Sequence, residues 1–368
     1  METRIIAEKK RIDSIDLLKG LAIYSVIIYH FNQIPTDFLK EDNGWFYFNY
    51  YIISFFSTCV PIFFFVNGAL LLNKEKIDMP KHIHKIVKII ILTVLWGGIT
   101  LISLSFIRKE LLSPLTILKE MWVLKQDWNM HLWFLCALVV IYIFYPVLYT
   151  AYKTNKKVFY FFFVCVLLFT FGNIFIGNLG TTLSYITNKF ADSNFQHNYW
   201  VDYNPFRGIK GYSIGYFMLG GILYNYRDVL NTPKFRILSI ITILISMFLL
   251  FIYGVIASLR TGEIWDIVWC GYDTIFTLMN VVAIFIITMN YTSKGQMGKL
   301  INLIGKNSLG IYFIHIIIGE ILKPLYSQTG VSSLLLANII FALVILLCSL
   351  LLVTGLKKIP IVKYLFSI

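Results

Sequence analysis

The sequence predicts an all-α, polytopic membrane protein with about ten transmembrane helices and both chain termini in the cytoplasm. Hydrophobic residues make up 58% of the 368 residues and charged residues only 14%. In soluble domains about 45–50% of the residues are apolar and about 25% are charged. Apolar stretches of membrane-spanning length recur along the chain, and lysine and arginine gather in alternate loops. We find no internal repeat and no appended soluble domain, so we expect residues 1–368 to form a single membrane domain.

Apolar stretches of about 17–25 residues, the length that crosses a bilayer, mark the predicted spans. The third, fifth, seventh and tenth are nearly free of charge, whereas polar or charged side chains interrupt the first and the sixth. The predicted spans are residues 16–33, 50–72, 86–107, 131–152, 158–177, 207–226, 236–257, 267–289, 300–321 and 332–355.

The distribution of basic residues sets the predicted orientation. With the N-terminus in the cytoplasm, the inner segments hold 22 of the 32 lysines and arginines, as the positive-inside rule requires. The formal charge of +13 is therefore a topology signal, and without a basic, aromatic-laced groove we exclude nucleic acid as a partner. We expect a multi-pass protein of the cell (plasma) membrane, and the lysine-rich, isoleucine-rich composition suggests a bacterial source.

Two of the predicted outer segments, 108–130 and 178–206, are longer than the other loops. The second contains "ADSNFQHNYWVDYNP", in which aromatic rings stand beside Asp and Asn. Such a surface suits carbohydrate, through stacking and hydroxyl hydrogen bonds, but it equally suits an aromatic belt at the membrane interface.

The first predicted span carries two ionisable residues in "KGLAIYSVIIYHF", where the uninterrupted apolar run is only Leu21 to Tyr29. Lys19 and His30 are eleven residues apart, which on a helix is about 20° from a whole number of turns and about 16 Å of rise. They therefore share one helix face, and Asp16 lies within about 40° of it. Intramembrane ionisable residues are costly and indicate function. The alternative is that Lys19 snorkels to the headgroups and His30 sits at the outer interface.

The segment "RIDSIDLLKGLAIYSVIIYH" resembles the opening of the acyltransferase-3 family of integral-membrane acyltransferases, which has a basic residue, ten intervening residues and then His. Lys19 stands where Arg is more usual, and "DLLKG" replaces "DGLRG". Further segments that resemble the family follow in order: "VPIFFFVNGALLL", "KHIHKIVKIII", "HLWFLCALVVIYIFYP", "YFMLGGILY" and "GKNSLGIYFIHI".

The resemblance implies a membrane O-acyltransferase, in the first instance an O-acetyltransferase, that takes acetyl from cytoplasmic acetyl-CoA. The implied acceptor is a hydroxyl of an extracytoplasmic cell-surface glycan, such as surface polysaccharide or a cell-wall polymer. Acetyl-CoA, this glycan and the lipid bilayer are the expected partners. A homo-oligomer or a surface-glycan assembly partner is left open.

On the cytoplasmic side, the resemblance implies that basic residues bind the phosphates of CoA. Lys19, Lys85 and Lys88 occupy those places, and Lys85 and Lys88 lie one helical turn apart, so both can address one ligand. Either of these two could instead be a topology charge. Asn67, with Gly68 after it, could donate an amide near the thioester or allow two helices to approach closely.

For the chemical step, the resemblance implies His30 as general base or as a covalent transfer residue, with Asp16 assigned to the same catalytic face. His131 and Trp133 open the fourth predicted span and could bind the acceptor, although a histidine at the membrane interface is the simpler explanation of His131. His315 could orient the donor or His30, or could pair with a hydroxyl inside the bundle.

A transporter or flippase for a polysaccharide precursor or an amino acid is the alternative function, because polar stripes inside a membrane also form substrate paths. Against it, we find no inverted repeat. We expect no metal: the five cysteines form no CxxC, and His82-x-His84 alone is weak evidence. Glu320, near the outer end of the ninth span, is expected to be solvated.

Overall fold

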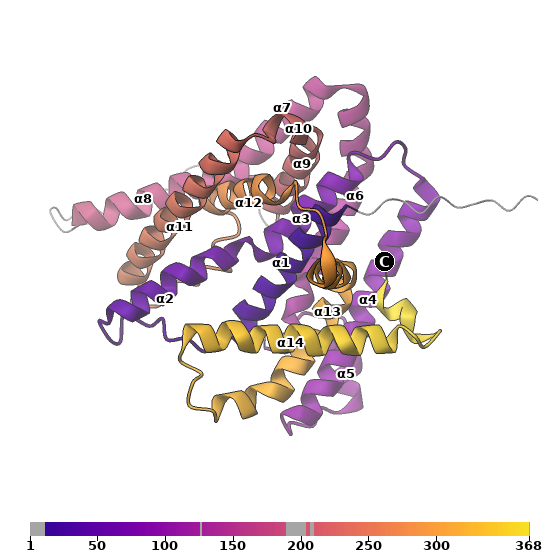
Figure 1. The fold of residues 1–368 in the computed structure, drawn as a ribbon, viewed down its shortest axis with the longest axis vertical. Coiled ribbons are helices and arrows are strands. Elements are labelled where there is room, and N and C mark those ends of the chain that lie inside the picture. The colour runs from indigo at the N-terminus through magenta and orange to yellow at the C-terminus, as the bar shows by residue number, and fades with distance from the viewer. Residues whose placement is uncertain (1–11, 126, 189–203, 207–209, 368) are drawn as a thin grey trace, which may run out of the picture.

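The computed structural model describes residues 12–125, 127–188, 204–206 and 210–367, and this part of the chain is helical, with no strand (Figure 1). Each of the ten predicted spans overlaps a helix. The "ADSNFQHNYWVDYNP" stretch, for which we left a glycan surface or an aromatic belt open, lies almost entirely outside the described residues.

The elements follow one another along the chain with short connections. They are α1 (Asp13–Phe31), α2 (Gly44–Ser54), η1 (Phe55–Thr58), α3 (Cys59–Leu71), α4 (Met79–Ile107), α5 (Pro114–Glu120), η2 (Met130–Leu132), α6 (Trp133–Thr154), α7 (Lys156–Leu167), η3 (Leu168–Gly172), α8 (Asn173–Asn188), α9 (Tyr212–Asn225), α10 (Arg227–Leu230), α11 (Pro233–Thr261), α12 (Ile275–Thr288), α13 (Gly295–Ser327), α14 (Leu335–Leu356) and η5 (Val362–Phe366).

Length separates complete crossings from shorter helices. Among the described residues, eight helical segments are long and apolar enough to cross a membrane, and α2 with α3 counts as one of them. α9 and α12 each have 14 residues, or about 21 Å of helix, against a hydrocarbon core of about 30 Å. The all-helical membrane fold is therefore confirmed, while the full number of crossings and the cytoplasmic position of the termini stay predictions.

α1 lies inside the bundle, where it contacts α3, α13 and α14 (Figure 1). Its most apolar window is 61% buried by the rest of the protein, against 28% for α11. Ala22, Ile23 and Ile27 have no exposed surface. A helix that is shielded from lipid by other helices can carry polar side chains at little cost. This explains why α1 can have the lowest mean hydropathy of the eight helical segments that are long enough to cross a membrane.

α3 and α9 pack closely because glycines remove the side chains between them. A Cβ atom placed on Gly68 of α3 would clash with the backbone of Phe217 in α9, and one on Gly220 would clash with the backbone of Phe65. Backbone-to-backbone approach at glycine is the usual way for membrane helices to gain packing contacts. Of our two alternatives for the Asn67-Gly68 pair, the structure supports close helix approach at Gly68.

Some of the helices, α4 and α12 among them, start at a side-chain cap. Asp78 accepts a hydrogen bond from the backbone N–H of Lys81 at the start of α4. Thr274 accepts one from the N–H of Thr277 at the start of α12. Such caps satisfy backbone donors that the first helical turn leaves free.

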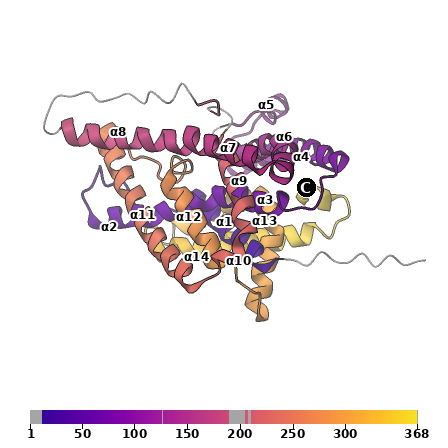
Figure 2. The ribbon, with the colours of Figure 1, turned by 90° about the horizontal axis from the view of Figure 1, so that it is seen from above.

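In Figure 2, as in Figure 1, the far end of α8 and the C-terminus lie on opposite sides of the molecule.

Substituting Gly68 with Ala should destabilise the fold, because the added methyl group meets backbone atoms that cannot rotate away. We expect a loss of about 1–3 kcal/mol, measured as a lower unfolding temperature in detergent. Gly355→Ala is the matched control, since nothing lies within 4 Å of a Cβ there. Equal unfolding temperatures for the two variants would contradict the close approach.

Candidate active site

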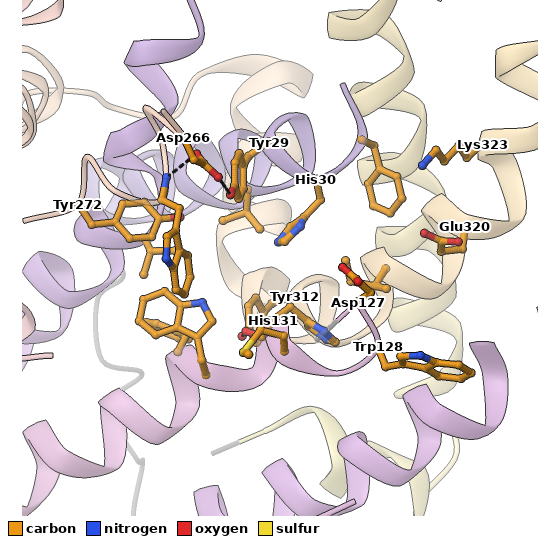
Figure 3. A pocket seen from close by; sticks show the side chains of 18 of the residues that line it. Tyr29, His30, Asp127, Trp128, His131, Asp266, Tyr272, Tyr312, Glu320 and Lys323 are labelled. Atoms are coloured by element: carbon orange, nitrogen blue, oxygen red, sulfur yellow. Dashed lines mark hydrogen bonds between the residues drawn. The ribbon is translucent and has the colours of Figure 1, made fainter. Parts of the chain in front are cut away.

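A cavity of about 680 Å³ opens at the C-terminal end of α1 (Figure 3). Its walls come from the last turn of α1, the end of α4, the connection before α6, the connection between α11 and α12, and the second half of α13. Segments that lie far apart in the sequence therefore meet around one face of α1. In the predicted orientation this is the outer end of the bundle.

Three imidazole rings form a cluster at this cavity. The ring centroid of His315 lies 5.5 Å from that of His30 and 5.8 Å from that of His131. His315 has no exposed surface and His131 is 6% exposed, whereas the ring of His30 is exposed and points into the cavity (Figure 3). The structure thus brings together the three histidines that the sequence singled out on three different predicted spans.

α13 fixes the two buried rings of this cluster. Nδ1 of His315 lies 2.7 Å from the carbonyl oxygen of Tyr312. A carbonyl only accepts hydrogen bonds, so Nδ1 carries the proton and Nε2 presents a lone pair. Nε2 of His315 and Nε2 of His131 have no hydrogen-bond partner among the described residues. The Tyr312 hydroxyl donates to the backbone oxygen of His131, which ties the connection before α6 to α13.

Tyr29 and Asp266 form a hydrogen-bonded pair beside His30. The Tyr29 hydroxyl donates to Oδ2 of Asp266 at 2.6 Å, and the Tyr29 and His30 ring centroids are 5.2 Å apart. Sequence analysis missed both residues: Tyr29 reads as part of the apolar run, and Asp266 lies in a connection without a motif. A second carboxyl of that connection, Asp273, does not line the cavity.

An ion pair closes the opposite wall. The guanidinium of Arg108 lies 3.3 Å from both carboxylate oxygens of Glu320 and donates to the backbone oxygen of Asp127 at 2.9 Å. Its centre also lies 5.4 Å from the ring centroid of Trp128. Our expectation that Glu320 is solvated was wrong: it is 21% exposed and paired. Arg108 thereby anchors the connection that carries His131.

Aromatic rings line a third side of the cavity. The ring of Trp133 lies 4.9 Å from that of Trp269 and 6.0 Å from that of Tyr272. Nζ of Lys210 lies 5.1 Å from the Trp269 ring and 5.7 Å from the Trp133 ring. Flat apolar rings beside charged and hydroxyl groups are the kind of surface that stacks against a sugar ring and holds its hydroxyls.

The structure does not bring Asp16 to this cavity. Asp16 lies on the same helix as His30 but fourteen residues earlier, or about 21 Å along the axis. It is 3% exposed, and Lys19 is half-buried one turn further along α1. Both belong to the opposite end of the bundle, so a direct contact between the Asp16 carboxylate and the His30 ring is not present.

Two of the remaining predicted donor-side residues, Lys85 and Asn67, group around Tyr142 of α6. Nζ of Lys85 lies 5.0 Å from the Tyr142 ring centroid, and the Tyr142 hydroxyl donates to Oδ1 of Asn67 at 3.0 Å. Lys88 points elsewhere: its Nζ lies 5.8 Å from the ring of Tyr364 near the C-terminus. Lys85 and Lys88 therefore contact different neighbours, although they lie one turn apart.

The fold and the cavity define a membrane protein that keeps titratable side chains inside its helix bundle, which is characteristic of membrane enzymes and transporters. The family model described as an acyltransferase domain matches residues 12–356, nearly the whole chain. The chain belongs to the acyltransferase-3 family and is a membrane acyltransferase. No curated protein and no solved structure matches it.

Substituting Arg108 with Met should loosen the connection before α6, because Glu320 then loses its partner and Asp127 loses a hydrogen bond. We expect a stability loss of about 1–3 kcal/mol, seen as a lower unfolding temperature and faster proteolysis at residues 121–130. Lys119→Gln is the control, since Lys119 is an exposed cation on α5. Unchanged proteolysis in Arg108→Met would show that the ion pair does not anchor this connection.

Proposed function

We propose that this acyltransferase moves an acetyl group from cytoplasmic acetyl-CoA to a hydroxyl of an extracytoplasmic cell-surface glycan, with His30 as general base. One observation carries the proposal: the exposed imidazole of His30 opens into a cavity of about 680 Å³ whose walls combine aromatic rings with charged side chains. An accessible imidazole beside a sugar-sized space is what proton abstraction from a sugar hydroxyl requires.

The proposed reaction keeps its protons in balance at His30. The neutral ring takes the proton of the acceptor hydroxyl while the hydroxyl oxygen attacks the thioester carbonyl. The carbon–sulfur bond of acetyl-CoA then breaks, and the leaving sulfur takes the proton back from the imidazolium. The products are the acetyl ester and free CoA, and His30 returns to its neutral form. A covalent acetyl-imidazole is the alternative route through the same residue.

The donor side of the proposal rests on cations at the opposite end of the bundle. Lys19, Lys85 and Lys88 would neutralise CoA phosphates by charge-assisted hydrogen bonds, and Asn67 would contact the donor beside Tyr142. Lys19 precedes His30 by eleven residues of α1, or about 16 Å. An extended pantetheine arm can bridge such a distance, which supports a donor that enters from the cytoplasmic end.

The acceptor side of the proposal uses the aromatic wall and the histidine cluster. Trp133, Trp269 and Tyr272 would stack against sugar rings, and His131, which lines the same cavity, would contact the acceptor. His315 would support His30 rather than touch the acceptor, because its ring is fully buried behind the cluster. The outer position of this wall in the predicted topology suits a glycan outside the cytoplasm.

Replacing His30 with Ala should abolish acetyl transfer, because no other described histidine is exposed inside the cavity. We expect the O-acetyl content of surface glycans, measured by mass spectrometry, to fall at least about 100-fold. His84→Ala, an exposed histidine near the start of α4, is the control. Undiminished acetylation at normal protein level would overturn the catalytic assignment.

Replacing Lys19 or Lys85 with Gln should weaken acetyl-CoA binding and leave membrane insertion intact. Loss of one charge-assisted contact lowers affinity by about tenfold, which calorimetry on the detergent-solubilised protein can measure. Lys156→Gln removes an exposed cation from the start of α7 as the control. If Lys19→Gln binds acetyl-CoA as well as the wild type, Lys19 is only a topology charge.

The transport alternative makes a different prediction. A transporter reconstituted in proteoliposomes moves its substrate without acetyl-CoA, whereas the proposed enzyme releases free CoA only while an acceptor is acetylated. The family match favours the enzyme.

A further inference from the structure

The carboxylate of Asp266 is held in one orientation at the cavity. Its Oδ1 accepts hydrogen bonds from the backbone N–H of Val268 at 3.1 Å and of Trp269 at 2.9 Å. Its Oδ2 accepts the Tyr29 hydroxyl at 2.6 Å (Figure 3). With three donors from two segments, this side chain has little freedom left, although it belongs to the connection between α11 and α12.

The orientation of Asp266 places its charge next to the last turn of α1. Tyr29 stands between the carboxylate and His30, and its ring contacts the His30 ring. Both Asp266 and His30 line the same cavity. Within the described chain no lysine or arginine forms an ion pair with Asp266, since Arg108 is committed to Glu320 and Lys210 lies over Trp133 and Trp269.

His30 has few neighbours that can compensate a positive charge. The rings packed against it are those of Tyr29 and His315, and His315 is itself an imidazole. Both His30 and Asp266 are exposed at the cavity, so water weakens the attraction between opposite charges there but does not abolish it. The carboxylate of Asp266, which is held in place behind Tyr29, is therefore the group on this side of the cavity that stabilises a protonated His30.

We propose that Asp266 is a positioning residue for His30, with Tyr29 as the link between them. This inference rests on the proposed function. When His30 takes the proton of the acceptor hydroxyl, the carboxylate stabilises the imidazolium, and the Tyr29 hydroxyl holds the end of α1 in register with the connection. The proton stays on His30 until the leaving sulfur takes it, and Asp266 remains ionised throughout, as the carboxylate of a catalytic triad does.

A purely structural role for Asp266 is the competing explanation, because its Oδ1 also caps the turn that carries Trp269. Asp266→Asn separates the two roles: an Asn oxygen caps as well as an Asp oxygen, but the charge is gone. Tyr29→Phe does the converse, since it keeps the charge and removes the link. Asp266→Glu restores the charge on a longer side chain.

The experiment measures transfer from radiolabelled acetyl-CoA to polymer in membranes of cells that carry each variant. For Asp266→Asn we expect kcat to fall by about 100-fold, while KM for acetyl-CoA and the unfolding temperature stay unchanged. Asp266→Glu should recover at least a tenth of the wild-type rate, and Tyr29→Phe should lose about tenfold. Glu263→Gln removes an exposed acid three residues before Asp266 and should behave as the wild type.

Each other outcome overturns the inference in a recognisable way. If Asp266→Asn keeps more than a third of the wild-type transfer rate, the Asp266 carboxylate is not required for acetyl transfer. Asp266 would have a role in the fold alone if Asp266→Asn lowers the unfolding temperature and the amount of protein in proportion to the rate. In that case Asp266→Glu would not restore the transfer rate. If the Asp266→Asn protein does not accumulate, the Tyr29→Phe variant still tests the proposal. A wild-type transfer rate in Tyr29→Phe would show that Tyr29 does not link Asp266 to His30. A wild-type protein that transfers no acetyl contradicts the proposed function itself, and with it this role.

Discussion

Shielding one polar helix from lipid is the constraint on which the rest of the structure depends. A membrane penalises charged and titratable side chains wherever lipid reaches them, and α1 carries Asp16, Lys19 and His30. α3, α13 and α14 surround it, so these side chains face protein and the cavity. The close approach of α3 and α9 at Gly68 and Gly220 lets the bundle tighten on that side.

Sequence reasoning succeeded where a helix alone fixes the geometry. Spans follow from apolar length, and the shared face of Lys19 and His30 follows from helical periodicity. It failed where contacts join distant segments. Nothing local in the sequence tells that Arg108 pairs with Glu320 across 212 positions, or that Tyr29 meets Asp266 across 237. Helical spacing also does not tell that Lys85 and Lys88, one turn apart, contact different neighbours.

The two ends of α1 differ in the chemistry they can offer. Around Tyr142, near the start of α4, an amide and a lysine gather in a setting suited to an anionic ligand. At the other end, imidazoles, carboxylates, indole rings and the cations Arg108 and Lys323 surround the cavity. The α1 helix, which packs against α3, α13 and α14, fixes the distance between its own two ends.

The walls of the cavity and its base have different structural origins. His30 and Tyr312 belong to long helices of the bundle, whereas Trp128, His131 and Trp269 come from the connections that join helices. Connections tolerate substitution and changes in length far better than packed helices do. Such a division permits changes in the connections at the rim of the cavity without disturbing the packed helices beneath them.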